Sequence, residues 1–167
     1  MTSLTFKGNK IETIGNFPQV GEMAPEFSLV QSDLSEITLS DFKGKKIIFN
    51  IFPSVDTPVC ALQLKKFSQA ISTIDNTILL FASLDLPFAF SRFCGTEGIT
   101  NAITASDYRD HSLEKNYGVK MKGGLLDGLY ARAVLILNEN HEIIYSELVQ
   151  EVTDEPNYEN AIAAVKV

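Results

Sequence analysis

The sequence has no long apolar segment. No stretch reaches the about 18 uncharged apolar residues that a membrane-spanning helix needs. Residues 1–7 also lack the apolar run of a secretory leader. These absences predict a protein that neither crosses nor is anchored in a membrane, and we expect it in the cytoplasm.

Positive charge is scarce as well. The chain has 14 lysines and arginines against 21 aspartates and glutamates, a net charge of −7, and no basic run. Nucleic acids and anionic membranes bind basic surfaces, so the sequence argues against both as partners. The composition, 45% apolar and 21% charged, is ordinary for a globular protein, and residues 1–167 fit one domain with an adequate core.

Cysteine is nearly absent. Cys60 and Cys94 are too few for a secreted disulfide framework, and a cytosolic cysteine pair is more often catalytic or redox-sensing than structural. Residues 60–63 also lack the second cysteine of a C-x-x-C motif. His111 and His141 lie in polar turns far from either cysteine, which is poor spacing for a zinc site. We therefore expect no metal and no other cofactor.

The most informative stretch is residues 53–60, where an apolar run ends and a helical pattern begins. Thr57 is expected as the N-cap, Pro58 as the first helical residue and Cys60 as the third. A thiolate there faces free backbone N–H groups and the positive end of the helix dipole, and both effects lower a cysteine pKa. Cys60 is thus a candidate nucleophile, although a free cysteine among apolar neighbours is often only a buried small side chain.

Arg132 is the second unusual residue, because it lies in the apolar run 131–137. An unpaired charge there is costly, so it needs an anionic partner. The Cys60 thiolate is the partner that we favour over a surface carboxylate. Arginine keeps its charge and offers several donors, so it can stabilise a thiolate and hold a substrate oxygen. Thr57 can cap the helix, bind that oxygen, or do both, and a turn is sufficient reason for Pro53.

The hydrophobic pattern predicts an α/β fold. Two apolar runs separated by a helical pattern indicate a parallel strand pair with a right-handed crossover. A hairpin at Gly8-Asn9 is expected at the start, and an antiparallel pair and a helix from Pro156 at the end. The expected segments are strands at 27–30, 47–52, 78–84, 131–137 and 142–148, helices at 64–74, 87–94 and 112–117, and irregular chain at 95–110.

These motifs together resemble one family. Pro53, Thr57 and Cys60 at their spacing, residues 86–94 and residues 131–133 are similar to bacterial atypical two-cysteine peroxiredoxins of the thiol peroxidase type, nearly end to end. The resemblance implies a thioredoxin-like fold, a mixed central sheet flanked by helices, with an N-terminal β-hairpin extension. It implies Cys60 as the peroxidatic thiol, with Thr57 and Arg132 as peroxide-binding groups and Pro53 in the same motif.

The same resemblance implies that Cys94 is the resolving thiol of the same chain, thioredoxin the reductant and a homodimer the assembly. The expected function is reduction of hydrogen peroxide and organic hydroperoxides through a Cys60 sulfenic acid and a Cys60–Cys94 disulfide. A thiol-disulfide oxidoreductase and a peroxide-responsive redox sensor remain alternatives, and a packed thiol is the alternative for Cys94. Catalytic turnover would separate a sensor from an enzyme.

Two further expectations concern the surroundings of the cysteines. Cys60 and Cys94 are expected on different helices, while a disulfide needs Cα atoms within about 7 Å, so the bond should form only after the Cys94 segment rearranges. Apolar residues near the cysteines in sequence could line a mouth for alkyl hydroperoxides, or could simply pack in the core. They are Phe52, Leu86, Phe88, Phe90 and Phe93.

Overall fold

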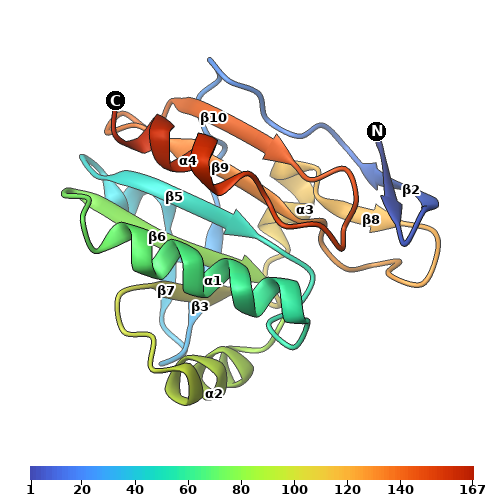
Figure 1. Ribbon diagram of the computed structural model, residues 1–167, viewed down its shortest axis with the longest axis horizontal. Coiled ribbons are helices and arrows are strands. Elements are labelled where there is room, and N and C mark those ends of the chain that lie inside the picture. The colour runs from blue at the N-terminus through green and yellow to red at the C-terminus, as the bar shows by residue number, and fades with distance from the viewer.

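A seven-stranded mixed sheet forms the centre of the computed structural model, which describes residues 1–167 (Figure 1). Its strand order is β10-β9-β5-β6-β7-β3-β4. The strands are β3 (Ser28–Gln31), β4 (Glu36–Thr38), β5 (Lys46–Ile51), β6 (Thr77–Ser83), β7 (Ile103–Ser106), β9 (Ala133–Leu137) and β10 (Ile143–Leu148).

Parallel and antiparallel pairs meet at β5. It pairs with β6 in parallel and with β9 antiparallel, and helix α1 (Pro58–Ile71) makes the crossover between β5 and β6. The parallel pair, the crossover helix and the β9–β10 hairpin confirm the α/β prediction, and the sheet is mixed as expected.

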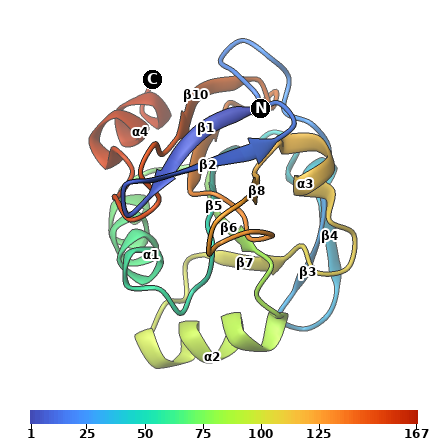
Figure 2. The ribbon, with the colours of Figure 1, turned by 90° about the vertical axis from the view of Figure 1, so that its right-hand side faces the viewer.

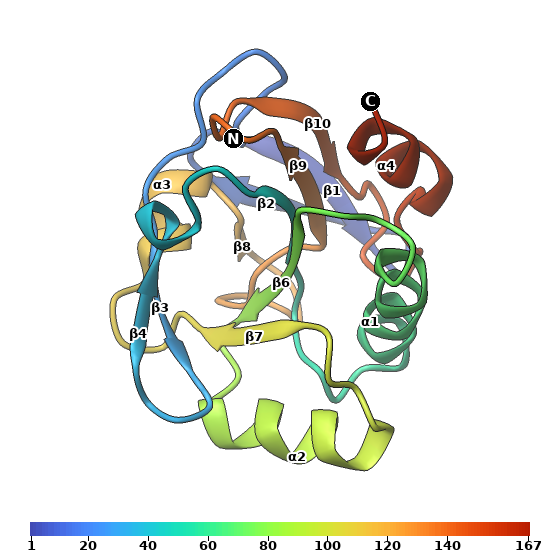
Figure 3. The ribbon, with the colours of Figure 1, turned by 90° about the vertical axis from the view of Figure 1, so that its left-hand side faces the viewer.

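Helices cover both faces of the sheet. Figure 2 and Figure 3 show α1 and α4 (Tyr158–Val165) on one flank and α3 (Ser112–Tyr117) on the other. Helix α2 (Pro87–Glu97) stands apart at the lower edge in all three views. Alternation along β5 explains the division, because Ile47, Phe49 and Ile51 belong to the core cluster that includes α3, whereas Ile48 belongs to the cluster that includes α1, α2 and α4. No helix is long and apolar enough to cross a membrane.

The N-terminal hairpin is confirmed and belongs to a separate small sheet. β1 (Thr2–Phe6) pairs with β2 (Asn9–Ile14), and β2 pairs with β8 (Lys120–Lys122), a strand that the sequence did not indicate. The turn lies one residue before the expected Gly8-Asn9, at Lys7 and Gly8, with φ of +50° and +81°, and Asn9 already pairs with Phe6. Thr5 also exchanges backbone hydrogen bonds with the segment after β10, at Gln150 and Val152, so the hairpin is fastened to the main body.

The prediction was wrong across residues 95–110. Helix α2 continues through Gly95 and stops at Gly98, whose φ of +67° provides the left-handed end. The short strand β7 then pairs with β6 and β3. Because β7 has only four residues and follows a helix that contains glycine, its pattern is too short to be recognised in the sequence.

Arg132 was also expected within a strand but lies just before β9.

Candidate active site

Helix α1 begins where the sequence predicted. Thr57 is the N-cap with extended dihedral angles, Pro58 is the first helical residue and Cys60 is the third. The Thr57 side chain does not cap the helix, which corrects one expectation. Its hydroxyl turns into the preceding loop and donates to the Ser54 carbonyl at 2.9 Å. The amides of the first helical turn therefore have no side-chain cap, and Cys60 lies in that same turn.

Cys60 and Arg132 lie in contact. The Cys60 side chain is 1% exposed, and Arg132 Nη1 donates to its Sγ at 3.1 Å. Arg132 is itself buried, at 2% exposed. Two residues 72 positions apart in sequence thus make the contact that the sequence suggested.

Two polar residues that the sequence reasoning missed hold Arg132 in place. Gln63 Oε1 accepts from Arg132 Nη1 at 3.1 Å, and Gln63 Nε2 donates to Asn50 Oδ1 at 2.7 Å. Arg132 Nε donates to the Val152 carbonyl at 3.1 Å. No buried side-chain polar atom lacks a partner. The signals were present: Asn50 interrupts an apolar strand, and Gln63 follows Cys60 by nearly one helical turn.

A cavity of about 260 Å³ opens beside Arg132. The start of α1 and the loop before it form one wall, with Pro53, Thr57, Pro58 and Val59, and Arg132 lies just before β9. The rest of the lining is mostly apolar and comes from the hairpin, the loop before Arg132 and the segment after β10: Phe6, Lys7, Leu126, Leu129, Val152 and Thr153.

The expected phenylalanine mouth was wrong. Phe52 and Phe90 are fully buried and pack edge to face with ring centroids 6.1 Å apart, and Phe93 belongs to the same core cluster. Leu86 and Phe88 are exposed and do not line the cavity. Core packing accounts for the three buried rings, and different apolar residues form the mouth.

Cys94 lies on α2 as a free, half-buried thiol. Burial raises its pKa, and a hydrogen bond with Thr104 partly opposes that shift. Cys60 is also free, so the structure has no bond between the two sulfurs. The sequence expectation that the cysteines lie on different helices is confirmed.

Polar contacts tie α2 to the loop before Cys60. Arg92 Nη2 is 2.8 Å from Asp56 Oδ1. Asp85, just before α2, accepts from the Ser54 hydroxyl at 2.8 Å and from the Val55 amide at 2.9 Å. A third contact joins Glu97 to Lys65 of α1 at 2.7 Å. These polar contacts add to the core packing of Phe90 and Phe93, which links α2 to the cluster that contains Cys60.

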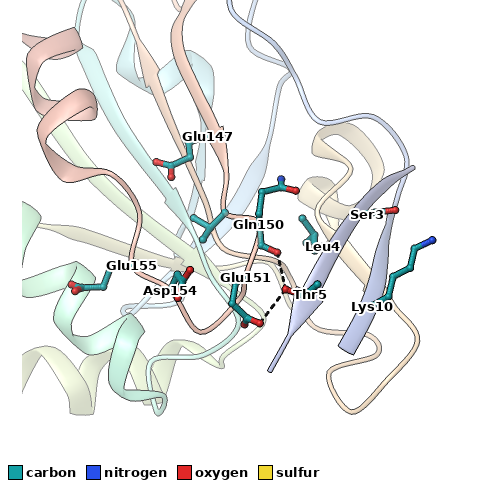
Figure 4. Close-up of a pocket in the computed structure, with 10 residues that line it drawn as sticks. Ser3, Leu4, Thr5, Lys10, Glu147, Gln150, Glu151, Asp154 and Glu155 are labelled. Carbon is teal, nitrogen blue, oxygen red and sulfur yellow. Dashed lines mark hydrogen bonds between the residues drawn. The ribbon is translucent and has the colours of Figure 1, made fainter. Parts of the chain in front are cut away.

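A larger hollow of about 490 Å³ lies elsewhere, between the hairpin and the segment after β10 (Figure 4). Neither Cys60 nor Arg132 lines it. Its carboxylates, Glu147, Glu151, Asp154 and Glu155, disfavour an anionic ligand. No group of three or more His, Cys, Asp or Glu side chains is arranged to hold a metal ion.

Known proteins share both the sequence and the fold. The Redoxin family pattern matches residues 19–162. The chain is 45% identical to a thiol peroxidase of Corynebacterium glutamicum and 47% identical to one of Listeria innocua, each over 99% of both chains. A peroxiredoxin-like protein from Aquifex aeolicus superposes with a TM-score of 0.94 at 37% identity, covering 99% of this chain and 96% of the other.

A more distant structure supports the fold. The thiol peroxidase from Chromobacterium violaceum has a TM-score of 0.91 at 21% identity and covers 99% of this chain and 96% of its own. High identity over the whole length, together with the Redoxin match, is what decides membership. The chain belongs to the Redoxin family and, within it, to the thiol peroxidases of the peroxiredoxin type.

Proposed function

We propose that this protein is a thiol-dependent peroxidase that reduces hydrogen peroxide and organic hydroperoxides at Cys60. The contact of Arg132 Nη1 with Cys60 Sγ, 3.1 Å long and beside an apolar cavity, carries the proposal. The relatives named thiol peroxidase support the same activity. A guanidinium against a sulfur at a helix start favours the thiolate, the form that reacts with peroxides.

The first step is a displacement at the peroxide O–O bond. The Cys60 thiolate attacks one oxygen, a sulfur–oxygen bond forms, and the O–O bond breaks. The bonding pair stays on the leaving oxygen, which takes a proton and departs as water or an alcohol. Cys60 is left as a sulfenic acid, oxidised by two electrons.

Three residues have supporting roles in that step. Arg132 donates hydrogen bonds to the peroxide and stabilises the developing negative charge. The Thr57 hydroxyl donates to Ser54, so its oxygen remains free to accept the peroxide O–H. Pro53 is buried and has no N–H, so it forms a wall of the cavity that offers no competing donor.

Cys94 resolves the sulfenic acid within the same chain. Its sulfur attacks Cys60, a disulfide forms, and the sulfenic hydroxyl leaves as water. Thioredoxin then reduces the exposed disulfide by thiol exchange. Because the cysteines are free and lie on separate helices, we expect α2 to move before the bond forms.

Substitution of each cysteine tests the scheme. Cys60→Ser should abolish rapid peroxide consumption, whereas Cys94→Ser should consume one peroxide per chain but not turn over with thioredoxin. After one equivalent of peroxide, non-reducing mass analysis of the parent should find a single chain with a Cys60–Cys94 crosslink. A covalent dimer as the main product would make resolution intermolecular, and near-parental activity of Cys60→Ser would remove Cys60 from the mechanism.

The two alternatives give other results in the same assays. A redox sensor would be oxidised once without sustained thioredoxin-dependent turnover. A thiol-disulfide oxidoreductase would reduce protein disulfides faster than peroxides, yet residues 60–63 contain only one cysteine. Sustained peroxide reduction with thioredoxin supports the peroxidase over both.

We also propose a cytoplasmic homodimer of one-domain chains, following the family resemblance. Light scattering should then give a mass near twice 18.4 kDa. A monomer mass across micromolar concentrations would contradict the dimer. Cell fractionation tests the compartment, and a single cooperative unfolding transition tests the single domain.

A further inference from the structure

The N-terminal hairpin is fastened by one carboxylate, Glu151. Glu151 Oε1 accepts from the Gly8 amide at 2.9 Å and from the Thr5 hydroxyl at 3.0 Å. Glu151 Oε2 accepts from the Lys7 amide at 3.2 Å, and from the amide and hydroxyl of Thr153 at 3.0 and 2.8 Å. Figure 4 shows the Glu151 side chain turned toward Thr5 of the hairpin.

The hairpin turn is shaped for this contact. Lys7 and Gly8 both have positive φ, and their successive N–H groups point at the same carboxylate. These donors, with the Thr153 amide as the largest contributor, lower the Glu151 pKa to about 2. The carboxylate is therefore ionised across the physiological pH range, and its hydrogen bonds to Thr5, Lys7 and Gly8 are called the latch below.

The latch joins two parts of the lining of the cavity beside Arg132. The amide of Lys7, next to Phe6 at the hairpin end, donates to Glu151. Val152 and Thr153 follow Glu151 in the chain, and the Thr153 amide donates to the same carboxylate. All of these residues except Glu151 line the cavity. The Thr5 backbone bonds to Gln150 and Val152 run parallel to the latch but leave the turn itself unheld. Phe6 also packs against the small core cluster around Leu4 and Ile11, so Glu151 is the contact that holds the backbone of the turn itself.

We propose that Glu151 is a specificity-determining residue: it holds Phe6 and Lys7 against the cavity so that the cavity can enclose the organic part of an alkyl hydroperoxide. This inference rests on the proposed peroxidase function. Hydrogen peroxide has no organic part, so it needs Cys60 and Arg132 but gains little from the hairpin wall. Glu151 acts on the substrate only through the residues that it positions.

The test compares Glu151→Gln with Asp154→Asn, a matched control in the same loop whose side chain makes none of the latch contacts. Glutamine keeps the size but loses the charge and one acceptor oxygen. In Glu151→Gln, we expect kcat/KM for cumene hydroperoxide to fall about tenfold, mainly through KM, and kcat/KM for hydrogen peroxide to fall less than about threefold. Phe6→Ala should give the same pattern with the latch intact, and Asp154→Asn should resemble the parent.

Equal losses for both peroxides would overturn the proposal, because Glu151 would then act through Val152 and Arg132, which Val152 binds. Equal rates in Glu151→Gln and the parent would also overturn it.

Two measurements do not depend on peroxidase activity. Amide hydrogen exchange at Lys7 and Gly8 should accelerate in Glu151→Gln and not in Asp154→Asn. Cumyl alcohol, the product from cumene hydroperoxide, should bind the reduced parent more tightly than Glu151→Gln in an NMR titration. A parent that reduces no peroxide but shows both differences would refute the proposed function and retain the latch, whereas equal alcohol binding would refute the latch.

Discussion

The two cysteines lie in regions built in different ways. Cys60 is nearly inaccessible, and its partner Arg132 is held by the buried amide of Gln63, which binds Asn50 of the central sheet. Cys94 is half-buried on α2, which is joined to the rest by exposed ion pairs and a few core rings. The polar contacts that fix the Cys60 region are buried hydrogen bonds, whereas the ion pairs of the Cys94 region are exposed and water can replace them.

This difference matches what the proposed mechanism requires of each sulfur. Attack on a peroxide needs a thiol and a donor already in position, because reorganisation during the reaction costs rate. Resolution needs one cysteine to travel to the other, which is cheapest for the segment with the weakest attachment. If the contrast is correct, substitutions in the Cys60 region should act by misplacing side chains, and those in the Cys94 region by changing how easily α2 detaches.

The largest effect is expected from Arg132→Lys. Lysine keeps the charge but cannot contact Cys60, Gln63 and Val152 together, as the arginine fork does. We expect the rate of peroxide reaction to fall about a hundredfold, measured by stopped-flow of the reduced protein. Circular dichroism and thermal unfolding should show that the fold is retained.

Arg109→Lys is the matched control, since Arg109 is exposed and lies away from the cavity. Its reaction rate should equal that of the parent. If Arg132→Lys were folded and as fast as the parent, charge alone would suffice and the positional account of the Cys60 region would fail.

The second effect concerns pH and Cys94. Burial raises the Cys94 pKa, so the fold disfavours the thiolate. The buried neutral Cys94 thiol therefore contributes to stability in full below the unfolded pKa of about 8.5, and this contribution is lost as the pH rises toward the higher folded pKa. In Cys60→Ser, Cys94 should react with iodoacetamide about tenfold more slowly at neutral pH than in the urea-unfolded chain.

The pH at the midpoint of Cys94 alkylation should be higher in the folded protein than in the urea-unfolded chain. A folded midpoint at or below the unfolded one would mean that Cys94 is already solvated. The contrast between the two regions would then lie in mobility alone and not in burial of the sulfur.

The sequence was most informative where one residue type has one physical reason. Proline after threonine at a strand end predicted the α1 start, and a charge in an apolar run predicted a buried partner for Arg132. It failed where several residues had to meet in space. Nothing in residues 1–14 indicates that Phe6 lines the cavity, because the residues that line it with Phe6, such as Leu126 and Val152, lie far along the chain.

Local sequence patterns also gave two wrong predictions. Phe52 and Phe90 are near the cysteines in sequence, but strand alternation and the helix face direct both into the core. Gly95 suggested a helix end, yet only Gly98 has the left-handed conformation that ends α2. Proximity in sequence and residue type alone could not decide either case.

The smallest effect is expected from Asp56→Asn, which removes the ion pair with Arg92. Both side chains are 60% exposed, so the pair is weak, but it joins the loop before Cys60 directly to the helix of Cys94. If α2 must detach for the disulfide to form, loss of this ion pair should speed Cys60–Cys94 disulfide formation about two- to fivefold after a peroxide pulse. Rapid quench and mass analysis measure this rate, while the initial oxidation of Cys60 should keep the parental rate.

Asp110→Asn is the control, because it removes an exposed ion pair with Lys115 on α3, far from both cysteines in the chain. It should leave disulfide formation unchanged. Salt gives an independent check: 0.5 M NaCl screens exposed pairs, so it should accelerate the parent more than Asp56→Asn. A slower disulfide in Asp56→Asn would reverse the interpretation, because the ion pair would then guide Cys94 toward Cys60 rather than restrain it.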